Sequence, residues 1–234
     1  MSRPMTTVAP MPVRESDPQQ IRRAFDAQFQ TAIAWRTSTA RERIDRIKRL
    51  REAVLKYRQE IYDAFQQDYR KCSAEVDLVE LMPFLDEARH AIGHLKKWMK
   101  PRGVWPTLVT GGNKAWVEYQ PRGRVLIVSP WNYPLNLLFG PLVSALAAGN
   151  TAVLKPSEMN PVLSALMARI VRETFPETEV AIFEGGVETS QALLDLPFDH
   201  IFFTGSPAVG RIVMGAAAKH LASVTLELGG KSPT

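Results

Sequence analysis

The sequence predicts an α/β protein in which a helical lead-in precedes a doubly wound, mostly parallel sheet. Up to about residue 113, apolar residues recur at the three-and-four spacing of helices. Beyond that point, short apolar runs alternate with helical segments, and the runs are apolar throughout, as in strands buried on both faces. We therefore predict a mobile leader over residues 1–17, a helical lead-in over 18–113 and an α/β domain over 114–234.

The lead-in is predicted to hold three helices, over residues 18–35, 39–69 and 76–99. The second helix is strongly basic, with eight basic and three acidic residues between Arg41 and Arg58. Together with the net charge of +5, this invites a nucleic-acid interpretation, which predicts a steep salt dependence of binding. We favour a solvated helix face, because apolar residues such as Ile47, Leu50 and Val54 form a buried stripe opposite the charges. We predict no nucleic-acid partner.

Composition also limits the cellular setting. The longest apolar stretch, Leu135–Ala148, is interrupted by polar and helix-breaking residues and is shorter than the about 20 apolar residues that cross a membrane. The first twenty residues lack the apolar run of a signal peptide. Cys72 is the sole cysteine, so no intrachain disulfide can form and a cytoplasmic location is predicted. We expect Cys72 to be structural or incidental.

The α/β domain is predicted from its alternation of period. Residues 115–119 are expected to form a strand or hairpin arm. Further strands are expected at 124–128, 151–154, 180–183, 200–203 and 223–226, with helices at 135–148, 161–174, 189–194 and 208–219. A turn rich in Gly, Pro, Ser or polar groups follows each of the last five strands. Because ligands gather beyond the carboxyl ends of parallel strands, these turns predict one site at one edge of the sheet.

Two of these turns suit a nucleotide. The segment Gly205–Gly210 offers a flexible turn, the Ser206 hydroxyl and backbone amides at a helix start, a combination that suits a phosphate, although a plain turn is an equal alternative. Lys155 and Glu158 can hydrogen-bond ribose hydroxyls. The alternative for that turn is a helix cap with Ser157 as the N-cap residue, and both can hold.

Two other turns offer catalytic groups. Asn132, between two prolines, leaves a neutral amide donor at the sheet edge that can stabilise an oxyanion, or it caps the following helix. Glu227 ends the last strand before a glycine pair and could act as a general base if partial burial shifts its pKa toward neutrality. A surface salt bridge would explain Glu227 equally well. No metal site is predicted.

Five segments together resemble the aldehyde dehydrogenase superfamily, and most closely its class 3 branch, which includes the coniferyl-aldehyde-type enzymes. They are PWNYP at 130–134, AAGNT at 147–151, LKPSE at 154–158, DHIFFTGS at 199–206 and LELGGKSP at 226–233. The likeness runs from about Asp17 to Thr234 and matches the amino-terminal portion of the family. It implies a Rossmann-like domain that binds NAD or NADP.

The resemblance also implies roles for single residues. Asn132 would help to form the oxyanion hole, and Glu227 would activate the water that hydrolyses an acyl-enzyme. Lys155 and Glu158 would meet the adenosine ribose, and the backbone of Leu228 would reach the nicotinamide carboxamide. The implied cofactor-binding set is Trp131, Lys155, Ser157, Glu158, Gly205, Ser206, Val209, Gly210 and Leu228. Glu158 favours a free ribose hydroxyl over a 2′-phosphate, which Lys155 partly offsets.

One departure from the family pattern is large. In the family, the catalytic cysteine lies beyond the segment that matches Glu227, and this sequence ends at Thr234. We therefore expect a truncated chain, inactive alone, from an enzyme that oxidises a small-molecule aldehyde to a carboxylic acid through a thiohemiacetal and an acyl-enzyme. The resemblance implies a homodimer in the complete form. The alternative is a non-catalytic dinucleotide-binding or interaction module.

Overall fold

The computed structural model describes residues 14–231, and residues 1–13 and 232–234 lie outside this part. Its centre is a five-stranded sheet in the order β5-β4-β3-β6-β7, and every neighbouring pair is parallel. The strands are β3 (Arg124–Val128), β4 (Thr151–Lys155), β5 (Val180–Ile182), β6 (His200–Gly205) and β7 (Ser223–Leu228). The predicted parallel sheet is confirmed.

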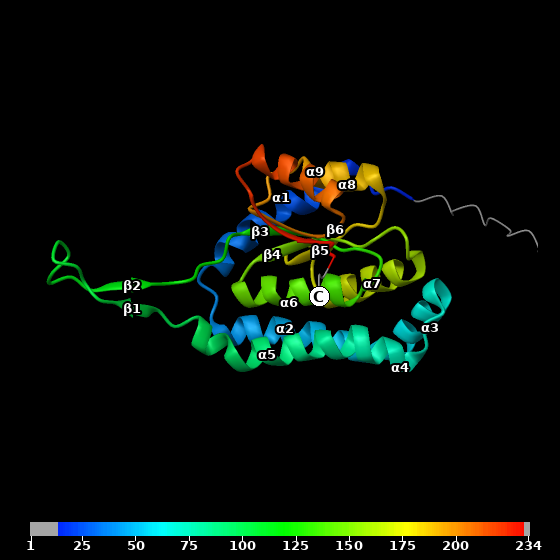
Figure 1. The fold of residues 1–234 in the computed structure, drawn as a ribbon, viewed down its shortest axis with the longest axis horizontal. Coiled ribbons are helices and arrows are strands. Elements are labelled where there is room, and N and C mark those ends of the chain that lie inside the picture. The colour runs from blue at the N-terminus through cyan, green and yellow to red at the C-terminus, as the bar shows by residue number, and fades with distance from the viewer. Residues whose placement is uncertain (1–13, 232–234) are drawn as a thin grey trace, which may run out of the picture.

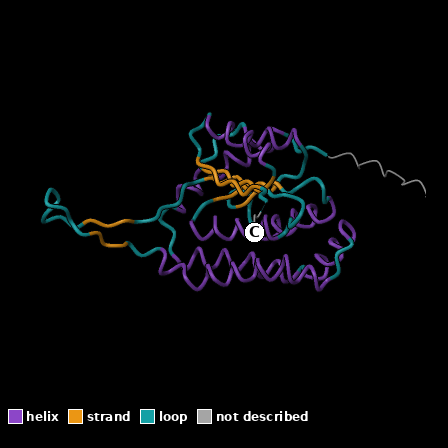
Figure 2. The backbone as a smooth tube through the Cα atoms, in the orientation of Figure 1, coloured by secondary structure: helices purple, strands orange, loops and turns teal. Residues whose placement is uncertain are grey.

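Helices lie in layers on the two faces of this sheet (Figures 1 and 2). One face is covered by α1 (Pro18–Trp35), α8 (Val187–Leu194) and α9 (Pro207–Ala218). The other face is covered by α6 (Asn136–Ala148) and α7 (Pro161–Thr174). An outer layer packs on these two helices and contains α2 (Ala40–Lys56), α3 (Arg58–Tyr69) and α5 (Met82–Trp98). The doubly wound architecture is thereby confirmed, and the lead-in helices contribute to both sides.

The sheet separates two apolar cores. On β3, Val125 and Ile127 point into the core shared with α2, α5, α6 and α7, whereas Leu126 between them points into the core under α1, α8 and α9. All three side chains are buried. Because successive side chains of a strand alternate between faces, a strand covered on both sides must be apolar at every position.

The second predicted helix is wrong as a single element. The structure divides it at Tyr57, whose φ of −92° and ψ of 11° leave the helical range, into α2 and α3. The two helices differ in their main partners, since α2 lies mostly against α5 and α6 with a smaller contact to α7, whereas α3 lies mostly against α7. Periodicity does not reveal this break, because the apolar spacing continues across it.

The third predicted helix, over residues 76–99, also begins differently from the prediction. The segment opens with α4 (Ser73–Val76) and a π-helical turn, η1 (Asp77–Leu81), before α5 begins at Met82. Pro83 occupies the first turn of α5. A proline inside a helix removes one N–H and clashes with the carbonyl four residues earlier, here that of Val79 within η1. The wider π turn is the local response to this proline.

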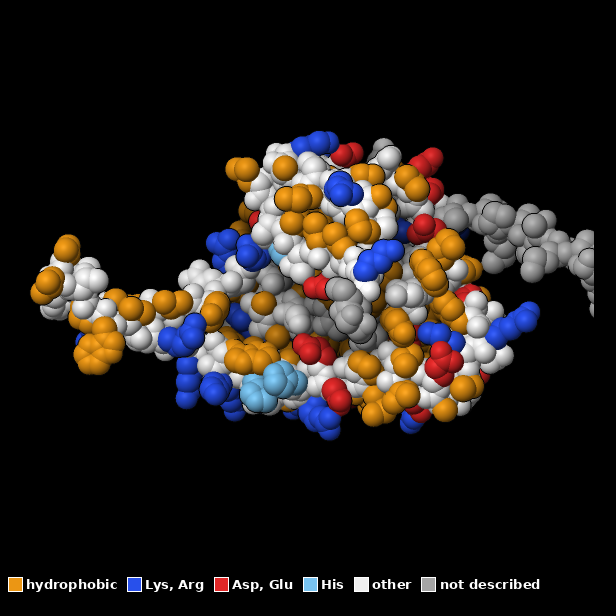
Figure 3. Space-filling view, viewed as in Figure 1, with side chains coloured by type: hydrophobic (Ala, Val, Ile, Leu, Met, Phe, Trp, Pro, Cys, Tyr) orange, Lys and Arg blue, Asp and Glu red, His pale blue; other side chains and the backbone are white. Residues whose placement is uncertain are grey.

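A two-stranded antiparallel hairpin projects from the body of the molecule (Figure 1). It pairs β1 (Arg102–Val104) with β2 (Ala115–Val117). The expected hairpin arm is confirmed, and its partner β1 lies where the sequence predicts no strand. Hydrophobic side chains gather along the projecting hairpin (Figure 3), and Trp105, which directly follows β1, is 93% exposed.

Most of the predicted leader lies outside the described residues. Of its last residues, Glu15 accepts hydrogen bonds from the backbone N–H groups of Gly186 and Thr189, both at 2.9 Å. The backbone N–H of Ser16 donates to Thr189 Oγ1 at 2.9 Å. These two residues of the predicted leader contact the start of α8. The boundary between residues 113 and 114 stays a prediction.

Two cations of the basic helix, Arg43 and Arg46, are buried. Arg43 is buried and donates from Nη1 to the carbonyl oxygens of Ala147 and Ala148, at 3.2 and 2.8 Å, and from Nε to Ser38. These carbonyls end α6, where cations are favoured by the helix dipole. Gly149 follows with φ of 86°, and a Cβ there would lie 2.6 Å from Arg43 Cζ. Arg43 thus ties α2 to α6.

Replacing Arg43 with alanine should lower the free energy of unfolding by about 2–4 kcal/mol, because the two carbonyls at the end of α6 lose a charged donor, one of them in a buried position. Urea unfolding followed by circular dichroism measures this difference. The control is Arg41→Ala on the same helix, where the side chain is 90% exposed and the change should stay within about 0.5 kcal/mol. Equal urea midpoints for the two variants would contradict the structural role of Arg43.

Candidate functional site

The parallel register brings the carboxyl ends of the strands into one row. Val128 pairs with Lys155 on one side and with Phe203 on the other. On the next strand pair, Thr204 lies opposite Glu227 and Gly205 opposite Leu228. The turns that carry the predicted site residues therefore leave the sheet at the same edge.

The strand order places a switch point at this edge. From β3 the chain proceeds outward through β4 to β5, and it then returns to the other side of β3 for β6 and β7. In such sheets, the crevice between the diverging halves is where ligands bind. Ser129 Oγ and Thr204 Oγ1, at the ends of β3 and β6, are buried and have no hydrogen-bond partner among the described residues. Buried hydroxyls without partners are costly, so a polar ligand fits here.

Lys155 and Glu158 form an ion pair beside the switch point, with Lys155 Nζ 2.8 Å from Glu158 Oε2. The Lys155 side chain is only 4% exposed. Burial acts to raise the pKa of Glu158, but the hydrogen bond and charge of Lys155 outweigh it and the pKa is lowered. Ser157 is buried, and its Oγ accepts from the backbone of Met159. The alternative in which Ser157 caps the next helix is wrong, because the N-cap residue of α7 is Asn160.

The turn after β6 forms a tight helix start. Ser206 is the N-cap residue of α9, and its Oγ accepts from the backbone N–H of Val209 at 3.3 Å. A Cβ at Gly205 would lie 2.5 Å from the Phe203 ring, and one at Gly210 would lie 2.9 Å from Leu228. Glycine is therefore needed at both positions, because Phe203 and Leu228 occupy the space that a Cβ would take. The turn leads into the amino terminus of α9, where backbone amides and the helix dipole favour an anion. These residues fit a phosphate group.

The loop after β3 carries Trp131 and Asn132, both exposed. The N-cap residue of α6 is Leu135, with no side-chain cap, so the alternative in which Asn132 caps this helix is wrong. The Tyr69 hydroxyl donates to the carbonyl oxygen of Trp131, and Lys71 Nζ donates to that of Asn132 at 3.5 Å. The loop is therefore held from the lead-in.

Glu227 lies at the end of β7, an edge strand among the described residues. Its side chain is exposed, so the expected partial burial is wrong. Within residues 14–231 it forms no ion pair, and the alternative of a surface salt bridge is not seen either. Leu228 is also exposed and contacts the start of α9 near Gly210.

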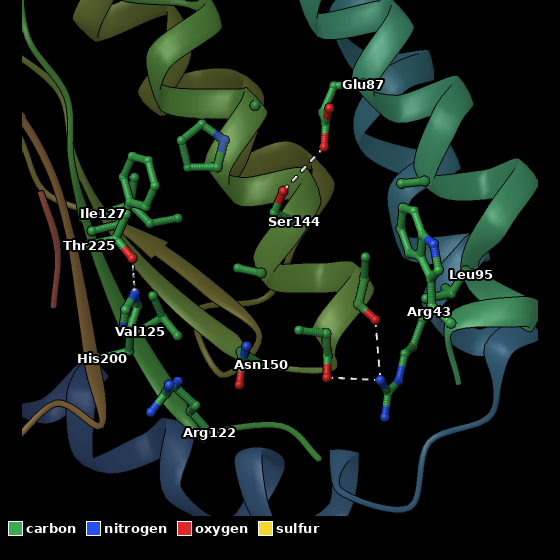
Figure 4. Close-up of a pocket in the computed structure, with 18 of the residues that line it drawn as sticks. Arg43, Glu87, Leu95, Arg122, Val125, Ile127, Ser144, Asn150, His200 and Thr225 are labelled. Carbon is green, nitrogen blue, oxygen red and sulfur yellow. Dashed lines mark hydrogen bonds between the residues drawn. The ribbon is translucent and has the colours of Figure 1, made fainter. Parts of the chain in front are cut away.

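A cavity of about 840 Å³ lies between α5, α6 and the adjoining face of β3, β6 and β7. Figure 4 shows Glu87 and Ser144 on its helical side and His200 and Thr225 on its sheet side. His200 Nε2 lies 3.2 Å from Thr225 Oγ1, and burial lowers the pKa of His200. Since the cavity runs along α6 rather than at the strand ends, it is separate from the predicted site.

Sequence reasoning missed one buried carboxyl. Glu80 on η1 is fully buried; its Oε2 accepts from the backbone N–H of Asn136 at 3.0 Å, and its Oε1 lies 3.6 Å from Lys71 Nζ. Burial raises the pKa of Glu80 to about 7, although Asn136 and Lys71 oppose the shift. A signal existed in the sequence, because Glu80 stands between Val76 and Phe84 at four-residue spacing, on the buried stripe.

The aldehyde dehydrogenase family model matches residues 1–234 of the chain. The chain belongs to the aldehyde dehydrogenase family. Within residues 14–231, no helix has the length and apolar character to span a membrane, and no cluster of His, Cys, Asp and Glu suited to a metal ion is found. The family's general activity is NAD(P)-dependent aldehyde oxidation, and its members commonly form oligomers.

The relatives support the branch predicted from the motifs. A putative aldehyde dehydrogenase, AldX, of Bacillus subtilis is 47% identical over 214 residues, which are 92% of this chain and 48% of that protein. A probable coniferyl aldehyde dehydrogenase of Pseudomonas aeruginosa is 42% identical over 215 residues, 92% of this chain and 45% of that protein. Family 3 members from Bos taurus and Homo sapiens are also similar, so the class 3 likeness is confirmed.

Comparison with solved structures indicates the same family. A substrate-bound structure of Staphylococcus aureus AldH superposes with a TM-score of 0.88 at 39% identity, over 91% of this chain and 46% of that one. This chain thus spans less than half the length of the relatives it matches, and it corresponds to the amino-terminal portion of the family fold.

Replacing Glu80 with glutamine should change how stability depends on pH. A carboxyl whose folded pKa is raised stabilises the fold fully below its ordinary pKa of 4.5, and this contribution is lost as pH rises through about 7. The free energy of unfolding of the wild type, relative to Glu80→Gln, should therefore fall between pH 5 and pH 8 by roughly 3 kcal/mol.

Urea unfolding at several pH values measures this slope. Glu75→Gln, in neighbouring α4 and exposed, is the control and should follow the wild type at every pH. A constant difference between wild type and Glu80→Gln across this range would show that the Glu80 carboxyl does not titrate as its burial requires.

Proposed function

We propose that this chain forms the dinucleotide-binding portion of an NAD(P)-dependent aldehyde dehydrogenase, whose complete form oxidises an aldehyde to a carboxylic acid. The observation that supports it most is the convergence, at one switch point, of the Lys155–Glu158 ion pair, the amino terminus of α9 and two buried hydroxyls without partners. Any one of these features alone would support a dinucleotide site only weakly. Their arrangement along neighbouring strands matches a dinucleotide laid across the sheet edge.

Each end of the cofactor has a proposed set of partners. Lys155 and Glu158 would hydrogen-bond the adenosine ribose, with Ser157 supporting their turn. Gly205, Ser206, Val209 and Gly210 would surround the adenine and pyrophosphate, and Trp131 and the backbone of Leu228 would lie toward the nicotinamide. Glu158 would disfavour a 2′-phosphate, so we propose NAD ahead of NADP.

The catalytic proposal concerns Asn132 and Glu227. Bound NAD(P) would supply the hydride acceptor. The Asn132 side-chain amide, exposed at the carboxyl end of β3, would donate a hydrogen bond to the oxygen of the reacting aldehyde and stabilise negative charge there. Glu227 would accept a proton from the attacking water; its exposed carboxylate is reachable by solvent.

We also propose a homodimer for the complete form and a cytoplasmic location. The projecting hairpin supports the first, because it exposes Trp105, Leu108, Val109 and Trp116. Exposed apolar surface of this kind marks interaction sites. Cys72 is exposed with a free thiol, as in proteins of reducing compartments. Nucleic acid is not a proposed partner, since Arg43 and Arg46 of the basic helix are buried.

The chain should bind NAD, and Lys155→Met should weaken binding by about tenfold or more, the loss expected for a hydrogen bond from a charged donor. Isothermal titration calorimetry measures both dissociation constants. Glu60→Gln removes a comparable but exposed ion pair, with Arg169, far from the sheet edge, and is the matched control. If the wild type shows no binding, or if Lys155→Met binds as tightly as the control, the cofactor proposal fails.

The 234-residue chain should not oxidise aldehydes, because hydride leaves an aldehyde carbon readily only after a thiolate has added to it and we assign no such role to Cys72. Absorbance of NADH, followed with a panel of aliphatic and aromatic aldehydes, tests this. Turnover that disappears in Cys72→Ser would overturn the assignment.

A further inference from the structure

Lys71 lies in a cage built from the lead-in and the loop after β3. Its ammonium is 5.4, 5.3 and 5.1 Å from the ring centres of Phe65, Tyr69 and Tyr133. Glu80 Oε1 lies 3.6 Å away, and the Lys71 side chain is 15% exposed. Aromatic faces and a carboxylate each attract a cation, and more strongly where water is excluded. The position of this ammonium is therefore narrowly defined.

The same cage holds the backbone on both sides of Asn132. Lys71 Nζ donates to the Asn132 carbonyl oxygen at 3.5 Å, and the Tyr69 hydroxyl donates to that of Trp131. At the other end of the loop, Glu80 accepts from the backbone N–H of Asn136 at 3.0 Å. The Asn132 side chain is exposed, and the backbone that these contacts hold sets the position from which it projects.

We propose that Lys71, paired with Glu80, is a positioning residue that fixes the loop after β3 and thereby aims the Asn132 amide at the sheet edge. The inference rests on the proposed role of Asn132 as a hydrogen-bond donor. Lys71 itself points to the backbone carbonyl and the Tyr133 ring, so it acts through the loop and not on the substrate.

The location of Glu80 supports a specific role for the pair. A fully buried carboxyl is costly to desolvate, and an apolar residue would pack on the same helical stripe more favourably. Glu80 also lies on η1, and single π turns within helices are frequent at functional sites. The buried charge stands where it reaches both Lys71 and the amide that starts α6.

Hydrogen exchange, followed by nuclear magnetic resonance, tests whether Lys71 and Glu80 fix the loop after β3. The reporter is the backbone amide of Leu137, which donates to the Tyr133 carbonyl at 2.9 Å and touches neither member of the pair. Lys71→Met keeps the length and apolar stem of the side chain but removes its charge. It should speed exchange at Leu137 by about tenfold or more, as expected for a lost charged hydrogen bond.

The pair is tested by combining variants. Glu80→Gln retains an acceptor for Asn136 but removes the partner of Lys71, so it should speed Leu137 exchange by a similar factor. The double variant should do no more than either single one. In both single variants the side-chain amide signals of Asn132, assigned by their loss in Asn132→Ala, should move by the same amount and in the same direction.

Arg58→Met is the matched control, because Arg58 pairs with Asp77 on the same π turn but does not contact the loop. It should leave Leu137 exchange and the Asn132 signals unchanged. The proposal is overturned if Lys71→Met behaves like Arg58→Met, or if the two single effects multiply in the double variant. Titration with NAD on the same samples tests the proposed function separately. NAD binding can be absent while Leu137 exchange responds as expected, and Leu137 exchange can stay unchanged while NAD binds.

Discussion

The parallel pairing of β3 with β4 on one side and β6 on the other is the constraint on which the candidate site depends. It makes β3 the centre of the sheet and puts Val128 in register with Lys155 and Phe203. Every turn that follows a strand is consequently delivered to one edge. Because helices cover both faces of the sheet, the side chains of β3 are buried on both sides, so this strand can contribute chemistry only through the loop at its end.

That loop is fixed by charges that come from outside the sheet. Some charged residues of the lead-in are buried, although the sequence does not distinguish them from the exposed ones. These buried residues contact the helices next to the sheet. Arg43 binds the carboxyl end of α6, whereas Glu80 binds its amino terminus. Each charge matches the end of the helix dipole that it contacts, but the Glu80 carboxyl is also fully buried, and its desolvation opposes this favourable placement.

The sequence was sufficient for features that depend on local pattern. The strands of the sheet and their order of appearance follow from apolar runs between helical segments, and the site edge follows from the parallel topology. Contacts between distant segments were not predictable: nothing near Tyr69 or Lys71 indicates that they bond to Trp131 and Asn132. The exposure of Glu227 also escaped prediction, because burial depends on neighbouring layers and not on the strand itself.

The central place of β3 has a consequence for biosynthesis. β3 ends at Val128 and β6 begins at His200, so about 70 residues must be added before the second edge of β3 can pair. At roughly 5–20 residues per second, a ribosome leaves that edge open for several seconds. An unpaired strand edge with apolar side chains, here residues 125–128, is a template for association with other chains. The nascent protein therefore passes through an interval in which this edge of β3 is open to wrong pairing until β6 has been synthesised.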